Sequence, residues 1–203
     1  MRNPERRGRR ADAVGPSTTR LTGGSARGRV IRSVGGRDLR PTSEKVRSAI
    51  FSILGPDVVV GATVLDLYAG TGVLGMEALS RAAESAVFVE AREAICHSIR
   101  ASLAELEMTN QARVVKASAE NALGHDEENF SLVFIDPPYR IDPWDSILGR
   151  MGSGDLLADN AVVIAEHYYK RELASAYGGL VKTTHRRYGD TSISIFDFGG
   201  TIA

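Results

Sequence analysis

The chain has 203 residues, of which 43% are hydrophobic and 25% charged, and its formal net charge at pH 7 is zero. This length suits one packed domain with an appendage, and the single cysteine excludes an internal disulfide framework and suits a reducing cytoplasm. No apolar run approaches the ~18 residues that a membrane span needs, so we expect a cytoplasmic protein without membrane contact.

The basic residues gather near the N-terminus. Residues 1–47 carry 13 lysines and arginines against 4 acidic residues, whereas the rest of the chain carries 12 against 21. A basic arm on an acidic body favours a polyanionic partner such as nucleic acid. We expect residues 1–18 to be a disordered basic tail. Glycines and apolar residues recur between the arginines of residues 19–42, which predicts a basic β-hairpin there.

Helices and strands alternate along the rest of the chain. A helix is expected to begin at Thr42 or Ser43 and to end at Gly55-Pro56. Further helices are expected after the glycine-rich turn near residue 70 and over about 92–108. Apolar runs predict strands at 62–68, 85–90, 112–117, 131–136 and 160–167, and two more strands meet at Gly189-Asp190. The class is therefore α/β with a mostly parallel sheet, and the alternation in "SISIF" favours an antiparallel hairpin at its edge.

Three strand ends carry residues suited to a small ligand, because ligands of such sheets bind at the carboxyl ends of the strands. The first strand ends in "DLYAGTGVLG", in which glycines allow a close approach of the backbone. The second ends at Glu90, a carboxylate that can accept from both hydroxyls of a ribose. The third is followed by small residues that can border an adenine ring. The candidate cofactor-binding residues are Asp66, Tyr68, Gly70, Gly72, Glu90, Ser118 and Ala119.

Asp66 helps to decide between NAD and S-adenosylmethionine, the two cofactors that a glycine turn of this kind commonly binds. In a dinucleotide fold the first strand runs directly into the first glycine, and the pyrophosphate lies at the helix N-terminus. Here an acid and three further residues precede Gly70. A carboxylate would repel a pyrophosphate but suits the sulfonium and ammonium groups of S-adenosylmethionine. We therefore favour S-adenosylmethionine over NAD.

The fourth strand ends in "FIDPPYR", residues 134–140. Two prolines cannot donate to a sheet, so the strand stops abruptly and the corner that follows is stiff. This corner presents Asp136 and the carbonyl of Pro137 beside the aromatic ring of Tyr139. In isolation such a stretch is an ordinary strand-ending turn, and the surrounding motifs must decide between the two interpretations.

With "LDLYAGTGVLGMEALSR", "VFVE" and "DPPY" in this order, the sequence resembles the class I S-adenosylmethionine-dependent methyltransferases. Within that class it is most similar to the bacterial 16S ribosomal RNA guanine-N(2)-methyltransferase family. The closer resemblance depends on "RPTSEKVRSAIFSIL" and "RRYGDT" and covers residues 19–198. It implies a Rossmann-like, seven-stranded, mostly parallel sheet with helices on both faces, an antiparallel last strand and an N-terminal β-hairpin. Residues 43–203 would form the methyltransferase domain.

The resemblance also implies roles for individual residues. The base pocket and the catalytic corner would consist of Asp136, Pro137, Pro138 and Tyr139. Residues expected to contact RNA are Arg27, Arg29, Arg40, Thr42, Arg47, Tyr188 and Asp190. The implied partner is 16S rRNA or the small ribosomal subunit, and we expect a monomer. The family commonly has a Gly-Asp pair where this chain has Ala117-Ser118, so the serine hydroxyl would replace a charged acceptor for the adenine amine.

The implied chemistry is methyl transfer to the exocyclic amine of a guanine. The amine is a poor nucleophile because its lone pair is conjugated into the ring. Hydrogen bonds to Asp136 and to the Pro137 carbonyl would make the lone pair available, and Tyr139 would stack on the base.

Without the family resemblance, the residues are also compatible with other functions. One is amino-methylation of DNA adenine or of protein glutamine, and another is a non-catalytic RNA-binding module with a degenerate cofactor pocket. An NAD oxidoreductase is disfavoured by Asp66. The scattered histidines and the lone cysteine show no metal-ligand spacing, so we expect no metal.

Overall fold

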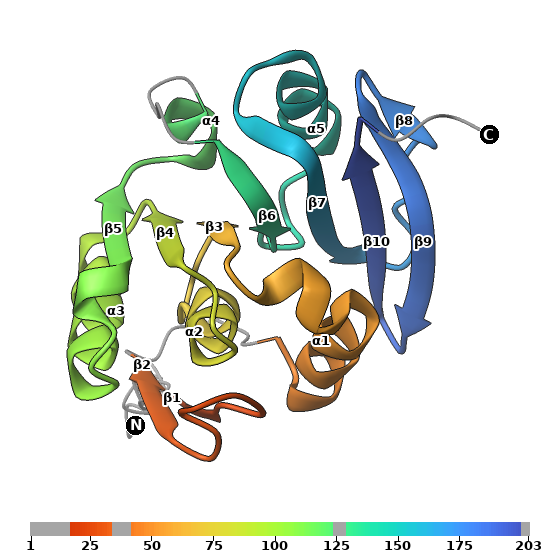
Figure 1. The fold of residues 1–203 in the computed structure, drawn as a ribbon. Coiled ribbons are helices and arrows are strands. Elements are labelled where there is room, and N and C mark those ends of the chain that lie inside the picture. The colour runs from red at the N-terminus through yellow and green to blue at the C-terminus, as the bar shows by residue number, and fades with distance from the viewer. Residues whose placement is uncertain (1–16, 34–41, 124–128, 200–203) are drawn as a thin grey trace, which may run out of the picture.

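The computed structural model describes residues 17–33, 42–123 and 129–199. Almost all of the predicted tail lies outside these ranges, as does the segment 34–41, which contains Arg40. Figure 1 shows a central twisted sheet with helices on both sides and a small hairpin below it.

The hairpin consists of β1 (Ser17–Arg20) and β2 (Val30–Ser33), paired antiparallel. It confirms the predicted N-terminal hairpin, although β1 already begins at Ser17, within the segment expected to be a tail. Leu21 and Ile31 are buried in the same apolar core as the helices of one sheet face. The hairpin is therefore packed as part of the domain.

The main sheet of the described residues has eight strands in the order β5-β4-β3-β6-β7-β10-β9-β8. Seven of them match the predicted seven-stranded sheet, and the additional β8 is a two-residue strand at the edge. Strands β5 to β7 are parallel, whereas β10 pairs antiparallel with both β7 and β9. The strands are β3 (Thr63–Leu67), β4 (Ser85–Glu90), β5 (Ala112–Lys116), β6 (Phe130–Ile135), β7 (Leu157–Tyr168), β8 (Ala176–Tyr177), β9 (Leu180–Tyr188) and β10 (Thr191–Phe198).

The helices divide between the two faces of the sheet. Strand residues alternate accordingly, so that Val64 and Phe88 enter the core under α1, α2 and α3, whereas Leu65 and Val87 enter the core under α4 and α5. The helices are α1 (Glu44–Val59), α2 (Val73–Ser80), α3 (Glu93–Glu105), α4 (Ala119–Ala122) and α5 (Trp144–Ser153), with a 3₁₀ turn η1 (Thr109–Gln111). This confirms the predicted doubly covered α/β class.

Helix α1 begins as predicted, because the Ser43 hydroxyl accepts a hydrogen bond from the backbone N–H of Val46. The predicted end at Gly55-Pro56 is a kink. Gly55 has φ 68°, and Pro56 then starts a further turn that runs to Val59. Proline is compatible with that position because a first-turn N–H needs no partner within the helix.

The antiparallel hairpin that "SISIF" predicted is formed by β9 and β10 near one edge of the sheet, but the serines of this strand do not face solvent. Strand β10 lies inside the sheet, and Ser192 and Ser194 are fully buried. The hydroxyl of Ser194 lies 3.0 Å from Nε2 of His167 and 3.1 Å from Nδ1 of His185. A polar side chain can be buried there because neighbouring strands supply hydrogen-bond partners.

The topology places a ligand site at the carboxyl ends of β3 and β6. From β3 the chain proceeds outward to β4 and β5, and it then returns to the other side of β3 as β6. The switch point between β3 and β6 is where open α/β sheets bind ligands. Asp66 lies near the end of β3, and Asp136 follows β6 directly.

Candidate active site

A pocket of about 810 Å³ opens at this switch point. Its wall combines the glycine turn after β3, the end of β4, the residues after β5, the DPPY corner after β6 and the turn between β9 and β10. Five segments that are far apart in the sequence therefore line one pocket. Its volume is in the range typical of small-molecule and cofactor sites.

The glycine turn holds the carboxylate of Asp66 in a fixed position. Asp66 is 2% exposed, and its Oδ2 accepts a hydrogen bond of 3.0 Å from the backbone N–H of Gly75. A Cβ atom at Gly75 would lie 2.4 Å from the ring of Phe88, so only glycine allows α2 to pack this close to β4. Gly72 has φ 72°, and the non-glycine residue Tyr68 has φ 58°. A strained backbone of this kind is concentrated at functional sites.

Glu90 closes the next side of the pocket at the end of β4. Its Oε2 accepts from the N–H of Gly70 at 3.2 Å, and its Oε1 accepts from the N–H of Arg92 at 2.9 Å. These bonds orient the carboxylate of Glu90 toward the pocket, which Gly70 and Arg92 also line. A carboxylate offers about four acceptor sites, so it is suited to bind hydroxyl donors as well.

Asp136 also lines the pocket and is held by the residue that precedes the N-cap of α1. The Thr42 hydroxyl donates to Asp136 Oδ2 at 3.0 Å. The carbonyl of Thr42 in turn accepts a 2.7 Å bond from Arg47 Nη1, and Arg47 Nη2 donates to the carbonyl of Arg20 in the hairpin. Arg47 thus connects Thr42, the partner of Asp136, to the N-terminal hairpin.

Tyr139 connects the DPPY corner to the turn between β9 and β10. Its hydroxyl shares a 2.6 Å hydrogen bond with the hydroxyl of Thr191, while its ring is 44% exposed. The ring is therefore fixed at one end and presents its surface at the pocket mouth. Such an aromatic surface is suited to stack against a planar base.

Burial raises the pKa values of both aspartates. Burial raises the pKa of Asp66 to about 8, against the effect of the Gly75 hydrogen bond and with a further contribution from the charges of Asp136 and Glu90. Burial likewise raises the pKa of Asp136 to about 7, and the hydrogen bond from Thr42 opposes this shift. The site is ready to bind a positive charge, which would lower both pKa values.

The pocket lining contains more acidic than basic side chains. The lining residues include five acids and two arginines, namely Asp66, Glu90, Asp136, Glu166, Asp190, Arg92 and Arg140. Such a lining suits cationic ligands and hydrogen-bond donors. It disfavours the pyrophosphate of a dinucleotide, for which the Gly-x-Gly-x-x-Gly spacing alone would also be suitable.

The structure brings most of the sequence-predicted site residues together. The pocket is lined by the predicted cofactor-binding residues except Gly72, by all four DPPY residues, and by Thr42, Tyr188 and Asp190. Ser118 lines it as the N-cap of α4, where its Oγ accepts from the N–H of Asn121. The serine therefore supports a helix terminus in addition to its predicted place beside an adenine.

Three predicted RNA contacts lie elsewhere. Arg27 and Arg29 are exposed on the hairpin, outside the pocket lining, and Arg29 donates to the backbone carbonyl of Glu105. Arg47 differs from the prediction, because its side chain is 1% exposed and is paired with the buried Glu77 at 3.8 Å. An arginine enclosed in this way positions other residues and has no surface for RNA phosphate.

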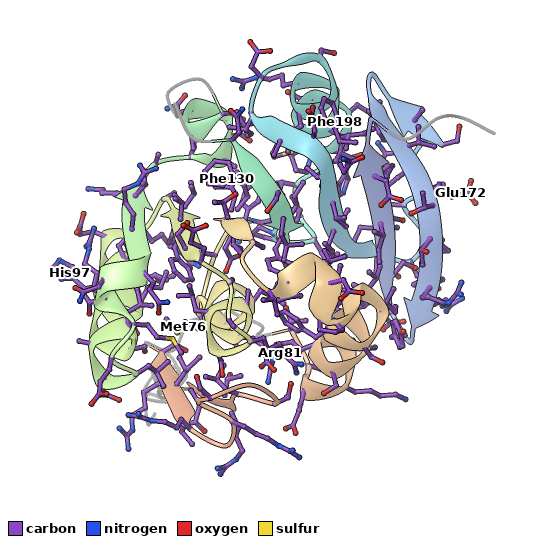
Figure 2. The ribbon with its side chains drawn as sticks, viewed as in Figure 1. Met76, Arg81, His97, Phe130, Glu172 and Phe198 are labelled. Carbon is purple, nitrogen blue, oxygen red and sulfur yellow. The ribbon has the colours of Figure 1, made fainter. Side chains whose placement is uncertain are left out.

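Glu77 was not predicted from the sequence. It is completely buried in α2, and its two oxygens accept from the backbone N–H of Thr22 at 2.9 and 3.1 Å and from Arg81 Nη2 at 2.9 Å. Figure 2 shows Arg81 in the region where α1 and the hairpin approach each other. The signal that could have revealed Glu77 is a lone acid within the otherwise apolar helix "VLGMEALS".

Within the described ranges, no helix is long and apolar enough to cross a membrane. In those same ranges no group of three or more histidine, cysteine, aspartate or glutamate residues is arranged to hold a metal ion.

The strand order, the antiparallel β10 and the pocket at the β3–β6 switch point together define a class I methyltransferase fold. The chain belongs to the family described as "Conserved hypothetical protein 95", whose model matches residues 19–197. This confirms the family to which the motifs pointed.

Relatives and solved structures that resemble this chain are described as methyltransferases. The chain is 37% identical over 152 residues to "Ribosomal RNA small subunit methyltransferase D" of Escherichia coli (strain K12), covering 75% of this chain and 76% of that protein. A solved structure titled "Putative methyltransferase yhhF from Escherichia coli" superposes with a TM-score of 0.81 at 29% identity, over 90% of this chain and 98% of that one.

A more distant structure shares the fold. It is titled "T. Thermophilus 16S rRNA N2 G1207 methyltransferase (RsmC) in complex with AdoMet and Guanosine". Its TM-score is 0.70 at 17% identity, over 90% of this chain and 50% of that one.

Proposed function

We propose that this chain transfers the methyl group of S-adenosylmethionine to the exocyclic amine, N2, of a guanine in small-subunit ribosomal RNA. The observation that supports the proposal is the acidic pocket that Asp66 and Glu90 line together with the DPPY corner. The names of the relatives support an RNA substrate from the small ribosomal subunit. We further propose a cytoplasmic monomer, with residues 19–42 as a hairpin extension and residues 43–203 as the methyltransferase domain.

The residues of the pocket fit S-adenosylmethionine. Asp66 offers a buried negative charge to the ammonium and sulfonium groups, and Glu90 offers acceptors to the ribose hydroxyls. Ala119 is a buried small residue beside which an adenine can lie. When bound, the cofactor supplies a methyl group that its sulfonium has already activated.

In this proposal Asp136 and the carbonyl of Pro137 bind the amine of the guanine. The carboxylate accepts one N–H, and the carbonyl accepts the other, so the nitrogen lone pair is directed toward the methyl group. A bound S-adenosylmethionine would supply the methyl group and would be left as a neutral thioether. The nitrogen that accepts the methyl group carries a transient positive charge, which the Asp136 carboxylate stabilises until the nitrogen releases a proton to water.

We expect the affinity for S-adenosylmethionine to rise with pH between about pH 6 and 7.5. The pKa of Asp66 is raised to about 8, so the side chain is mostly protonated in the empty pocket and must release its proton when a cation binds. Each proton released makes the association constant rise by up to about tenfold per pH unit. The ligand's own ammonium stays mostly protonated in this range, because an α-amino group has a pKa of about 7.7–8.0.

Calorimetric titrations in two buffers of different ionisation enthalpy would measure this proton release directly. The Asp66→Asn variant, which has no proton to lose at this position, serves as the control and should show a smaller release. If both proteins showed the same pH dependence, Asp66 would not be the titrating group.

The proposed activity is tested with radiolabelled S-adenosylmethionine and small ribosomal subunits from cells that lack this methylation. Naked small-subunit rRNA, plasmid DNA and a protein extract are incubated in parallel. We expect label in the ribosomal RNA, recovered as N(2)-methylguanine after digestion. Label in DNA or protein would point to the other amino-methyltransferases. Binding of RNA with no label in any substrate would indicate a non-catalytic RNA-binding module.

A further inference from the structure

Beyond the pocket mouth, a row of tyrosine rings continues across the surface. The ring of Tyr139 lies 5.8 Å from that of Tyr168, and the ring of Tyr168 lies 4.8 Å from that of Tyr169. Tyr139 belongs to the DPPY corner and is 44% exposed, whereas Tyr168 ends β7 and is 36% exposed. Three rings therefore form a path from the pocket that accepts the target base to the outer surface of the protein.

Two cations accompany the outer end of this row. The guanidinium carbon of Arg187 lies 3.7 Å from the ring centre of Tyr169, and Lys170 Nζ lies 5.7 Å from the same centre. Both basic residues are exposed. Arginine that is stacked on an aromatic ring keeps its edge free for planar hydrogen bonding, which suits phosphate.

The surrounding backbone holds this surface rigid. Arg187 Nε donates to the carbonyl of Gly189 at 2.8 Å, and the backbone N–H of Tyr169 donates to the carbonyl of Asp190 at 3.1 Å. Tyr168 is the register partner of Thr191, whose hydroxyl bonds Tyr139. The rings thus have fixed positions relative to the pocket, as a binding site for a second nucleotide requires.

The charges of the two regions differ in sign. The pocket lining is acidic, as described above, whereas Lys170 and Arg187 are positive and exposed. A guanine amine is compatible with the acidic pocket, but the phosphate groups on either side of that guanine are not. The backbone of the bound RNA must leave the pocket, and this surface offers it both cations and aromatic faces.

We propose that Tyr168, Tyr169, Lys170 and Arg187 form a subsite for one nucleotide adjacent to the target guanine. This inference rests on the proposed RNA methylation. The base of the neighbouring nucleotide stacks on Tyr168, and its phosphate binds Arg187 and Lys170. Stacking on a ring is possible only for a base that is not stacked in a helix, so the enzyme requires an unpaired neighbour beside the guanine.

The test uses RNA hairpins that carry the target guanine in an unpaired loop, and it measures kcat and KM separately. For Tyr168→Ala we expect a KM for RNA raised by about tenfold, in line with the loss of one stacked base, with kcat nearly unchanged. Tyr168→Phe keeps the ring and should retain the wild-type KM. A KM unchanged in Tyr168→Ala, in the presence of normal wild-type activity, would overturn the subsite.

An abasic nucleotide placed next to the guanine provides the second arm. On the side that the subsite binds, it should raise the wild-type KM about as much as Tyr168→Ala does, and it should add little to the effect of that variant. Fully additive effects at both neighbouring positions would contradict the proposed contact. No methylation of the intact RNA by the wild-type protein would instead count against the proposed function itself.

Arg187→Gln and Arg186→Gln form a matched pair of charge changes on β9. Both remove one exposed positive charge, but only Arg187 is stacked on Tyr169, whereas Arg186 Nη1 donates to the carbonyl of His185. We expect a severalfold rise in KM for Arg187→Gln and a clearly smaller one for Arg186→Gln. Equal rises in KM for the two variants would show that Arg187 contributes only through nonspecific electrostatic attraction. That result would overturn its place in the subsite.

Discussion

Replacing Asp136 by alanine should lower the rate of methyl transfer by about 10²–10³-fold while the protein still binds S-adenosylmethionine. This is the usual cost of removing one preorganised group that stabilises charge in a transition state. The carboxylate is held by the hydroxyl of Thr42 and follows the end of β6, in the same pocket as Asp66. The variant removes the acceptor for the amine and the negative charge that balances the developing cation.

Single-turnover rates with labelled cofactor, together with calorimetric titration of the cofactor, would check this expectation. Affinity for S-adenosylmethionine should stay the same or rise slightly at pH 7, because the charge of Asp136 contributes to the raised pKa of Asp66. Asp142→Ala serves as the control, since that exposed acid pairs with Arg171 outside the pocket. A rate within about threefold of wild type in Asp136→Ala would exclude the role assigned to the DPPY corner.

Replacing Glu77 by alanine should destabilise the fold by about 3–5 kcal/mol, the usual cost of leaving a buried charge without its partner. Arg47 is 1% exposed and Glu77 is completely buried, so water cannot replace the lost carboxylate. Burial lowers the pKa of Arg47, and the charge of Glu77 is the first of the effects that oppose this shift. The same substitution removes the acceptor for the N–H of Thr22 and so loosens the hairpin.

Urea denaturation followed by circular dichroism would measure the loss in free energy of unfolding. Glu77→Gln keeps the acceptor oxygen and should lose less than Glu77→Ala. The control is Glu105→Ala, which removes the exposed partner of Arg32 and should cost less than about 1 kcal/mol. Equal losses in the two alanine variants would show that burial does not determine the contribution of the pair.

Much of the fold could be predicted because the parallel strands are covered on both faces. Such strands are continuous apolar runs, and "SAVFVE" coincides with β4 from Ser85 to Glu90. The positions of Asp66 and Asp136 at neighbouring strand ends follow from the same topology. The pocket could therefore be assembled from motifs alone, even though its residues are up to 149 positions apart, from Thr42 to Thr191.

The remaining features depend on contacts between segments that no local pattern reveals. Arginine is usually a surface residue, so the sequence does not indicate that Arg47 is buried. Its burial depends on the ion pair with Glu77 of α2. The buried Ser194 of β10 depends in the same way on the histidines of the neighbouring strands. The stretch "HYYKR" contains no motif that would indicate a function for Tyr168 and Tyr169. Their position near the pocket results from the pairing of β7 with β10.

The attachment of the hairpin to α2 has a consequence for the synthesis of the chain. The residues of the hairpin loop bind α2 through contacts such as Thr22 with Glu77 and Ser25 with Ser80, each 55 positions apart. The hairpin leaves the ribosome before α2, so its docking surface is completed only after α2 has followed. Since contacts of large sequence separation form late, the basic hairpin is made before α2 but is fixed in place only afterwards.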